Sequence, residues 1–248
     1  MQETKDKELI ACLCALHQDS NGIFGYRRMH IYLKRRYGLT VNKKRIYRLM
    51  RALDMQSVIR RKRPSYIRST PEITAENILN RNFNADNLNE KWLTDVTEFK
   101  CGDGTKLYLS AILDLKDKCI ISYKVGRRNN NLLVFNTFDA AVSKHPDAKP
   151  LFHSDRGFQY TSKVFKAKLD AAGMIQSMSR VGRCIDNGPM EAFWGTIKAE
   201  MYYLQNFKCY AHLEAAITKY VEFYNNERYS IKLGGLAPAE YREMLLAA

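Results

Sequence analysis

Apolar residues in the first 57 positions recur at helical spacing in three short stretches. The first runs from Lys5 to His17, and the second from Tyr26 to Arg36, ending near Gly38. The third runs from Lys43 to Leu53, with Leu, Ile and Met on one face and Lys and Arg on the other. We therefore expect three helices, the last two joined by a short turn as in a helix-turn-helix.

The pattern changes from helical to alternating after Lys91. Apolar and polar residues alternate from Trp92 to Phe99, and the sequence Gly-Asp-Gly at 102–104 is typical of a hairpin turn. Residues 106–115 and 119–125 indicate two further strands. We expect these three strands to form an antiparallel meander.

The remaining chain alternates helices with short strands. Residues 130–144 predict an amphipathic helix, followed by a buried strand at 150–155, a helix through Phe165 and Leu169, and a strand at 174–178. Two helices follow, from Asn187 to about Tyr203, with an apolar stripe, and from Tyr210 to Asn225. This order favours an α/β fold with a mixed sheet covered by helices on both faces.

Between these parts lies a stretch of different composition. Arg60, Arg61, Lys62 and Arg63 precede a proline, and polar residues rich in Asn follow. Such a stretch has little apolar surface to offset the entropy of ordering, so we interpret it as a linker. The predicted division is a helical region at 1–57, a basic and polar linker at 58–87 and a core at 88–248.

Positive charge is concentrated in the first third of the chain. The net charge is +14, and residues 1–76 hold 17 Lys and Arg against 7 Asp and Glu. Basic residues clustered on predicted helices favour nucleic acid as the partner. A three-helix bundle that mediates only protein contacts is the alternative.

Several other classes of protein are disfavoured. No run of about 18 apolar residues is present and the N-terminus is unlike a signal peptide, so we expect a cytoplasmic protein without a membrane partner. The six cysteines form no CxxC pair, which argues against a zinc site or a disulfide framework.

Three acidic residues lie at positions that suggest a functional site. Asp95 lies within a predicted central strand, Asp155 ends a buried strand, and Glu191 falls in the first turn of the helix that starts near Asn187. If these elements are neighbours, three carboxylates meet and repel one another unless cations lie between them. Oxygen ligands of this kind suit Mg²⁺ or Mn²⁺, and two such ions can carry out phosphoryl transfer.

The sequences around these acids resemble the catalytic blocks of DDE transposases of the retroviral-integrase type. They are Trp-Leu-Thr-Asp-Val-Thr-Glu-Phe around Asp95, His-Ser-Asp-Arg-Gly-Phe-Gln-Tyr around Asp155, and Asp-Asn-Gly-Pro-Met-Glu-Ala-Phe-Trp-Gly-Thr-Ile-Lys around Glu191. Asp155 and Glu191 are separated by 35 residues, the spacing for which this group is named.

Two further stretches narrow the resemblance to the OrfB transposases of the insertion sequence three family. Phe-Tyr-Asn-Asn-Glu-Arg-Tyr-Ser-Ile at 223–231, followed by Leu-Ala-Pro-Ala-Glu-Tyr at 236–241, is similar to the C-terminal signature of that family. Phe-Gly-Tyr-Arg-Arg-Met at 24–29 and Val-Asn-Lys-Lys-Arg-Ile-Tyr-Arg-Leu-Met at 41–50 resemble its helix-turn-helix-like block.

The resemblance implies a ribonuclease-H-like core that binds two Mg²⁺ or Mn²⁺ ions through Asp95, Asp155 and Glu191. Water or a DNA 3′-hydroxyl would attack a phosphodiester at the ends of the element, and strand transfer would follow without a covalent enzyme intermediate. It also implies double-stranded DNA as partner, a homo-oligomer on DNA, association with the nucleoid, and a possible upstream OrfA product or fusion.

Further residues are expected to line the site or to contact DNA. Gln159 and Asn187 are expected to line the site, His153 to be structural, and Asp114 to lie near the acids without binding metal. Contacts with DNA are expected from Lys43, Lys44, Arg45, Arg48, Arg60, Arg61, Lys62, Arg63, Arg156 and Lys198. A DNA-binding regulator or assembly fragment with an inactive core, or a metal-dependent nuclease without strand transfer, remains an alternative.

Overall fold

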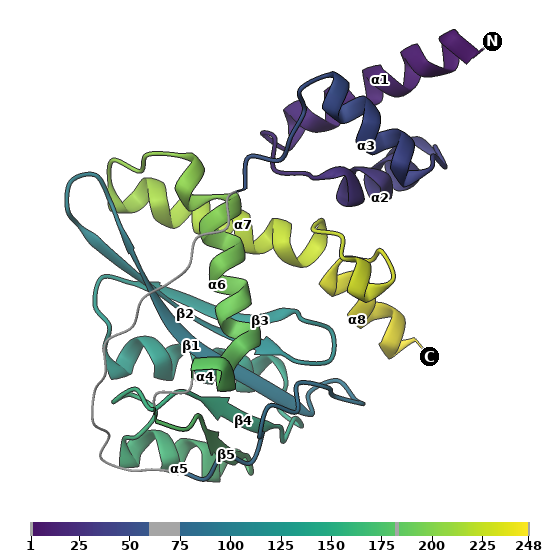
Figure 1. Cartoon of the computed structure of the whole chain (residues 1–248). Helices are drawn as coiled ribbons and strands as arrows, with labels where there is room; N and C mark the ends of the chain where they lie inside the picture. The colour runs from purple at the N-terminus through teal and green to yellow at the C-terminus, as the bar shows by residue number, and fades with distance from the viewer. Residues whose placement is uncertain (1, 60–74, 182–183, 248) are drawn as a thin grey trace. The chain divides into compact units, whose positions relative to one another are not determined.

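The computed structural model describes residues 2–59, 75–181 and 184–247. They form two compact units (Figure 1). One unit contains the first three helices together with residues 228–237, and the other contains a sheet with the remaining helices. None of the described helices is long and apolar enough to cross a lipid bilayer.

The helical unit is built from α1 (Gln2–Asp19), α2 (Tyr26–Tyr37) and α3 (Lys43–Ala52), as predicted. Helix α2 ends at Gly38, whose φ of 66° is readily adopted only by glycine. The side chain of Asn42 caps α3 by accepting a 2.8 Å hydrogen bond from the amide of Lys44. Apolar side chains from all three helices are buried together: Leu9, Leu13, Leu16, Met29, Leu33, Ile46 and Met50.

A short segment from late in the chain completes this unit. The ring of Tyr229 lies 4.6 Å from that of Tyr32, centroid to centroid, and the guanidinium of Arg35 lies 4.2 Å from the Tyr229 ring centre. The segment turns back on itself through η3 (Ile231–Leu233) and a bridge between Ser230 and Leu236. The sequence analysis did not predict this association, because nothing in the local pattern names a partner so distant in sequence.

The core unit contains a five-stranded sheet in the order β3-β2-β1-β4-β5. Strands β1 (Lys91–Lys100), β2 (Lys106–Asp114) and β3 (Ile120–Gly126) form the predicted antiparallel meander. Strand β4 (Leu151–Ser154) runs parallel to β1, and β5 (Ile175–Met178) runs parallel to β4. The predicted mixed sheet is thereby confirmed.

Helices cover both faces of this sheet (Figure 1). Helices α4 (Asn131–Lys144) and α5 (Lys163–Ala171) contribute to the apolar cluster on one face. Helices α6 (Gly188–Glu200) and α7 (Tyr210–Asn226) contribute to the cluster on the other. Two short 3₁₀ helices, η1 (Cys184–Asn187) and η2 (Tyr202–Leu204), flank α6.

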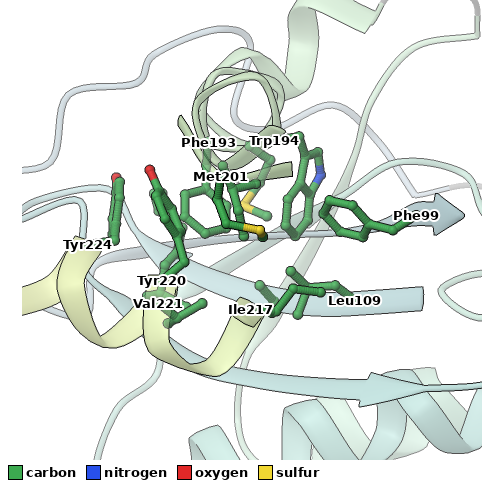
Figure 2. Packing of buried hydrophobic residues seen from close by; sticks show 14 of the residues in the cluster. Phe99, Leu109, Phe193, Trp194, Met201, Ile217, Tyr220, Val221 and Tyr224 are labelled. Carbon is green, nitrogen blue, oxygen red and sulfur yellow. The ribbon is translucent and has the colours of Figure 1, made fainter. Parts of the chain in front are cut away.

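The cluster between α6, α7 and the strands holds α6 in place. The predicted stripe of Phe193, Ile197 and Met201 is buried there. Figure 2 shows Phe193 and Trp194 packed with residues of the strands and of α7. Because α6 carries Glu191, this apolar packing sets the position of a predicted site residue.

Residues 75–87, which we had assigned to a linker, pack on the core. Leu79 is only 2% exposed, and its amide donates a 3.1 Å hydrogen bond to the hydroxyl of Ser177. Asn77 and Arg81 both bond the buried carboxylate of Asp186. The segment is ordered both by these polar contacts and by apolar residues that pack on the core, Leu79, Phe83 and Ala85, which its overall composition does not reveal. Residues 60–74 lie outside the described residues.

Helix α8 (Pro238–Leu246) was not predicted. It supplies the cation that pairs with the buried carboxylate of Asp114. Arg242 donates to Asp114 at 2.8 Å and to Asp117 at 2.5 Å, and both carboxylates are fully buried. Asp114 pairs with Trp92 in the sheet, three positions before Asp95 on β1. Asp114 therefore forms an ion pair with α8, and its expected place near the acids without binding metal stays a prediction.

We predict that Arg242→Met destabilises the protein by on the order of 3 kcal/mol at neutral pH, because it leaves two buried carboxylates without their cation. Burial and the charge of Asp117 raise the pKa of Asp114 to about 6, and Arg242 lowers it. Removing Arg242 raises that pKa further, so the loss should be small near pH 4 and should grow as pH rises towards 8. Urea unfolding across this range, with the exposed Glu243→Gln as control, measures the effect. A loss independent of pH would contradict it.

Candidate active site

The register between β1 and β4 brings two of the predicted acids to the same level of the sheet. Leu93 pairs with His153, so Asp95 and Asp155 each lie two residues further along neighbouring parallel chains. Adjacent strands lie about 4.8 Å apart. Asp155 directly follows the last residue of β4, at the carboxyl end of the strand. The structure therefore brings the first and fourth strands together as expected.

The Asp95 carboxylate is held by two hydrogen bonds. The amide of Val96 donates to Oδ1 at 2.8 Å, and the indole Nε1 of Trp194 donates to Oδ2 at 2.9 Å. Removal from water raises the pKa of Asp95 well above its usual range, and the negative charges of Asp155 and Glu191 add to this effect. The two hydrogen bonds act in the opposite direction. Asp155 and Glu191 are thus each close enough to Asp95 to act on it electrostatically.

Asp155 is fixed by the turn that follows it. The amide of Gly157 donates to Asp155 Oδ1 at 2.9 Å. A side chain at position 157 would place its Cβ 3.0 Å from that oxygen and from Oε1 of Gln159, so glycine permits this close approach. Burial raises the pKa of Asp155 too, and the Gly157 amide partly offsets it.

Glu191 lies in the first turn of α6, whose start is tied to β1. The side chain of Asn187 does not cap the helix; its Nδ2 instead donates a 3.0 Å hydrogen bond to the carbonyl of Thr94, the residue before Asp95. Asp186 is bonded by Arg180 as well as by Asn77 and Arg81. The start of α6 is therefore anchored by polar contacts on two sides.

Polar contacts between α6 and β1 continue along both elements. After Asn187 and Trp194, Lys198 donates to Thr97 at 2.7 Å. The hydroxyl of Tyr202 then donates to the carbonyl of Lys100, also at 2.7 Å. The helical rise from Asn187 to Tyr202 is about 22 Å, and the strand from Thr94 to Lys100 spans about 20 Å. The matching lengths let one helix meet the strand repeatedly, with Glu191 at the end near Asp95.

Lys198 faces the site without neutralising an acid. Its ammonium contacts Thr97 and lies 5.3 Å from the centre of the Phe99 ring. Burial lowers the pKa of Lys198, whereas the charges of Asp95 and Glu98 raise it. A half-buried cation on α6, two helical turns after Glu191, therefore contacts the strand that carries Asp95.

Other predicted site residues already have protein partners. Arg156 Nε donates to the carbonyl of Ser179 at 2.7 Å, and Gln159 bonds the side chain of Asn129. Both nitrogens of the buried His153 contact hydroxyls, those of Ser177 and Ser179, at 2.9 and 3.1 Å. Burial lowers the pKa of His153 to about 4, which keeps the ring neutral at physiological pH. These contacts support the expected structural role of His153.

The donor atoms of the acidic group fit a hard cation. Among the residues the structure describes, however, no three His, Cys, Asp or Glu side chains are arranged to hold a metal ion. Asp155 and Glu191 lie within electrostatic reach of Asp95, and all three side chains contribute only oxygen donors. The buried Oδ1 of Asn187 accepts no hydrogen bond from any described group. The donor atoms of the group are thus oxygens, which are the ligands that Mg²⁺ and Mn²⁺ prefer.

The predicted DNA-contacting residues of the helical unit lie on α3. Lys43, Lys44 and Arg48 are exposed, while Arg45 is half-buried. The buried Ile46 and Met50 attach the opposite face of the helix to its unit. Four other candidates lie outside the described residues: Arg60, Arg61, Lys62 and Arg63.

Sequence reasoning overlooked the polar role of Trp194. Its place beside the apolar stripe of Phe193, Ile197 and Met201 predicts only a packed ring. Trp194 follows Glu191 by three residues, which places both on one side of the helix. A buried indole N–H also needs an acceptor. These two signals pointed to a polar partner near Glu191, but not to Asp95 in particular.

Comparison with known families covers most of the chain. Residues 4–63 match the family model of an HTH-like domain, and residues 85–184 and 191–246 match two models of an integrase core domain. The first corresponds to the helical unit, and the other two together span β1 to α8. The matches therefore agree with the two kinds of unit in the structure.

Individual relatives are similar over nearly their whole length. The chain is 42% identical over 228 residues to the putative transposase InsK for insertion sequence element IS150 from Escherichia coli, covering 92% of this chain and 80% of that protein. It is 30% identical to the transposase for insertion sequence element IS904 from Lactococcus lactis, covering 98% and 96%.

A solved structure shares the fold. The cryoEM structure of a simian T-cell lymphotropic virus intasome in complex with PP2A regulatory subunit B56 gamma matches with a TM-score of 0.50 and 15% identity, over 87% of this chain and 69% of that one. At this identity the likeness concerns the fold alone, and it agrees with the predicted ribonuclease-H-like core. The sequence matches show that the chain belongs to the integrase-core transposases of the insertion sequence three family.

Proposed function

We propose that this transposase cuts DNA at the ends of its insertion sequence and joins them to a target at a site formed by Asp95, Asp155 and Glu191. The observation that carries the proposal is the convergence of β1, β4 and α6, which brings three carboxylates from distant parts of the chain into electrostatic reach. Two Mg²⁺ or Mn²⁺ ions held by these acids would polarise the attacking oxygen and stabilise the leaving oxygen.

The electrostatics support binding of cations at this position. Burial and mutual repulsion raise the pKa of Asp95, so its charged form is disfavoured unless positive charge is nearby. Lys198 is the near cation, but its hydrogen bond goes to Thr97. The negative charge of the acids is thus available to divalent ions, and Lys198 to a DNA phosphate.

The chain's own residues orient the acids for the reaction. Val96 and Trp194 fix the Asp95 carboxylate, and Gly157 fixes Asp155. In cleavage, water attacks the phosphorus and the 3′-oxygen of the element leaves. In strand transfer, that 3′-hydroxyl attacks a target phosphodiester, so one phosphodiester forms as another breaks and no enzyme intermediate is needed.

The helical unit supplies a surface for double-stranded DNA. Lys43, Lys44 and Arg48 are exposed on α3 and suit contacts with phosphates, with Arg45 beside them. We also propose that the chain acts as a homo-oligomer on DNA, in the cytoplasm at the nucleoid, with an OrfA product or fusion assisting recognition of the ends. These proposals are supported by membership of the family.

Replacing Asp155 by Asn should reduce cutting of labelled element ends by at least about 100-fold, as when a single charge-stabilising group is removed from an active site. Gel-shift affinity for the same DNA should change little, because α3 is untouched. Asp170→Asn, an exposed acid on α5, is the control. Normal cutting by Asp155→Asn would refute the site.

The products of the unsubstituted protein distinguish the alternative functions. Nicking without joined product would indicate a nuclease, and no cutting would indicate a regulator.

The raised pKa values predict that the metal-free protein is least stable where the acids are charged. The folded protein holds protons more tightly than the unfolded chain, so stability should fall as pH rises from about 4 towards neutrality. In EDTA at pH 8, Asp155→Asn should be more stable than the unsubstituted protein, by roughly 1.4 kcal/mol for each pKa unit of repulsion removed. Mg²⁺ should raise the melting temperature of the unsubstituted protein alone. Equal stabilisation of both proteins by Mg²⁺ would count against a metal site at Asp155.

Replacing Lys43 and Lys44 together by Ala should weaken DNA binding and make it less dependent on salt. Each lost phosphate contact should reduce the slope of log affinity against log salt by about 0.9. Fluorescence anisotropy over a salt series measures this slope. Lys166→Ala is the control, because it removes an exposed lysine on α5, in the core unit. An unchanged slope in the double variant would show that the start of α3 does not contact phosphates.

A further inference from the structure

Trp194 links the apolar core to the acidic group. Its side chain is 6% exposed, and its ring lies 5.0 Å from that of Phe193 in the cluster shown in Figure 2. Its Nε1 nevertheless donates a 2.9 Å hydrogen bond to Oδ2 of Asp95. One rigid, packed ring therefore places a donor directly on a predicted metal ligand.

The two hydrogen bonds to the Asp95 carboxylate come from donors in different parts of the chain. The Val96 amide is adjacent in the chain and reaches Oδ1, whereas the Trp194 indole comes from α6 and reaches Oδ2. With one donor on each oxygen, the carboxylate cannot rotate freely. Each oxygen keeps a second lone pair for another ligand. The same helix carries Glu191. The position of α6 therefore determines both where Glu191 lies and how the Asp95 carboxylate is oriented.

An indole suits this position because it is an uncharged hydrogen-bond donor. The Trp N–H is a donor only and carries no charge, so it orients a carboxylate without neutralising it. A Lys or Arg in the same place would cancel the negative charge that attracts a divalent ion. The nearby Lys198 is directed to Thr97, which leaves the indole as the side-chain donor to Asp95 among the contacts described.

We propose that Trp194 is a positioning residue for the reaction: its indole N–H holds Asp95 in the orientation that binds a divalent cation. The inference rests on the proposed function, since it takes Asp95 to be a metal ligand. It adds to that function a group that touches neither metal nor DNA and that acts through Asp95.

Trp194→Phe tests this role, because it keeps an aromatic ring in the core and removes the N–H. The concentration of Mg²⁺ that gives half-maximal cutting should rise by roughly 10-fold or more, as for other groups that orient metal ligands. Trp92→Phe is a matched control: it removes a buried indole whose N–H donates to Asn89 at 3.2 Å and not to one of the three acids. Its Mg²⁺ requirement should equal that of the unsubstituted protein. An unchanged requirement in Trp194→Phe would overturn the inference.

A second measurement needs no substitution in the protein being titrated. The chain has two Trp residues, so its ¹⁵N-labelled form has two indole N–H resonances, which Trp92→Phe assigns. Titration with Mg²⁺ should shift the Trp194 resonance and leave that of Trp92 in place. If Mg²⁺ supports cutting but the Trp194 resonance does not move, the positioning role is wrong and the proposed function stands. If the unsubstituted protein neither binds Mg²⁺ nor cuts, the proposed function itself fails.

Discussion

The negative charge that acts on the buried Asp95 carboxylate is the constraint on which the candidate site depends. Asp95, Asp155 and Glu191 come from β1, the end of β4 and the start of α6, and burial of the first two increases the cost of keeping them charged. Isolated buried carboxylates are unfavourable, so a fold retains them only where other contacts hold them in place. Here those contacts are backbone amides, the Trp194 indole and the attachment of α6. The same repulsion that raises the pKa of Asp95 supports the proposal that the group binds divalent cations.

The attachment of α6 combines two kinds of interaction. The apolar cluster with α7 and the strands supplies the burial, and polar contacts from Asn187 to Tyr202 set where the helix lies along β1. Before the helix, salt bridges from Arg81 and Arg180 hold the pKa of Asp186 well below its usual range. Apolar packing alone is not directional. The polar contacts therefore fix where α6, which carries Glu191, lies along β1.

Patterns of nearby residues predicted much of the fold, while distant partners were not predictable. Alternation and helical spacing identified all five strands and most helices, and the three acids followed from unusual placement and from resemblance to a family. The bond from Trp194 to Asp95 and that from Arg242 to Asp114 join residues about 100 or more positions apart, and neither has a local signal. Residues 75–87 were misjudged because Asn77 and Arg81 are ordered by Asp186, a charge that the local composition does not reveal.

A crystal structure with Mn²⁺ bound tests the central claim most directly, because the anomalous signal locates the ions independently of the protein atoms. Two-ion phosphoryl transfer predicts two peaks about 4 Å apart, coordinated by oxygens of Asp95, Asp155 and Glu191. Mn²⁺ bound elsewhere, with these three side chains contacting no ion at saturating concentrations, would contradict the assignment.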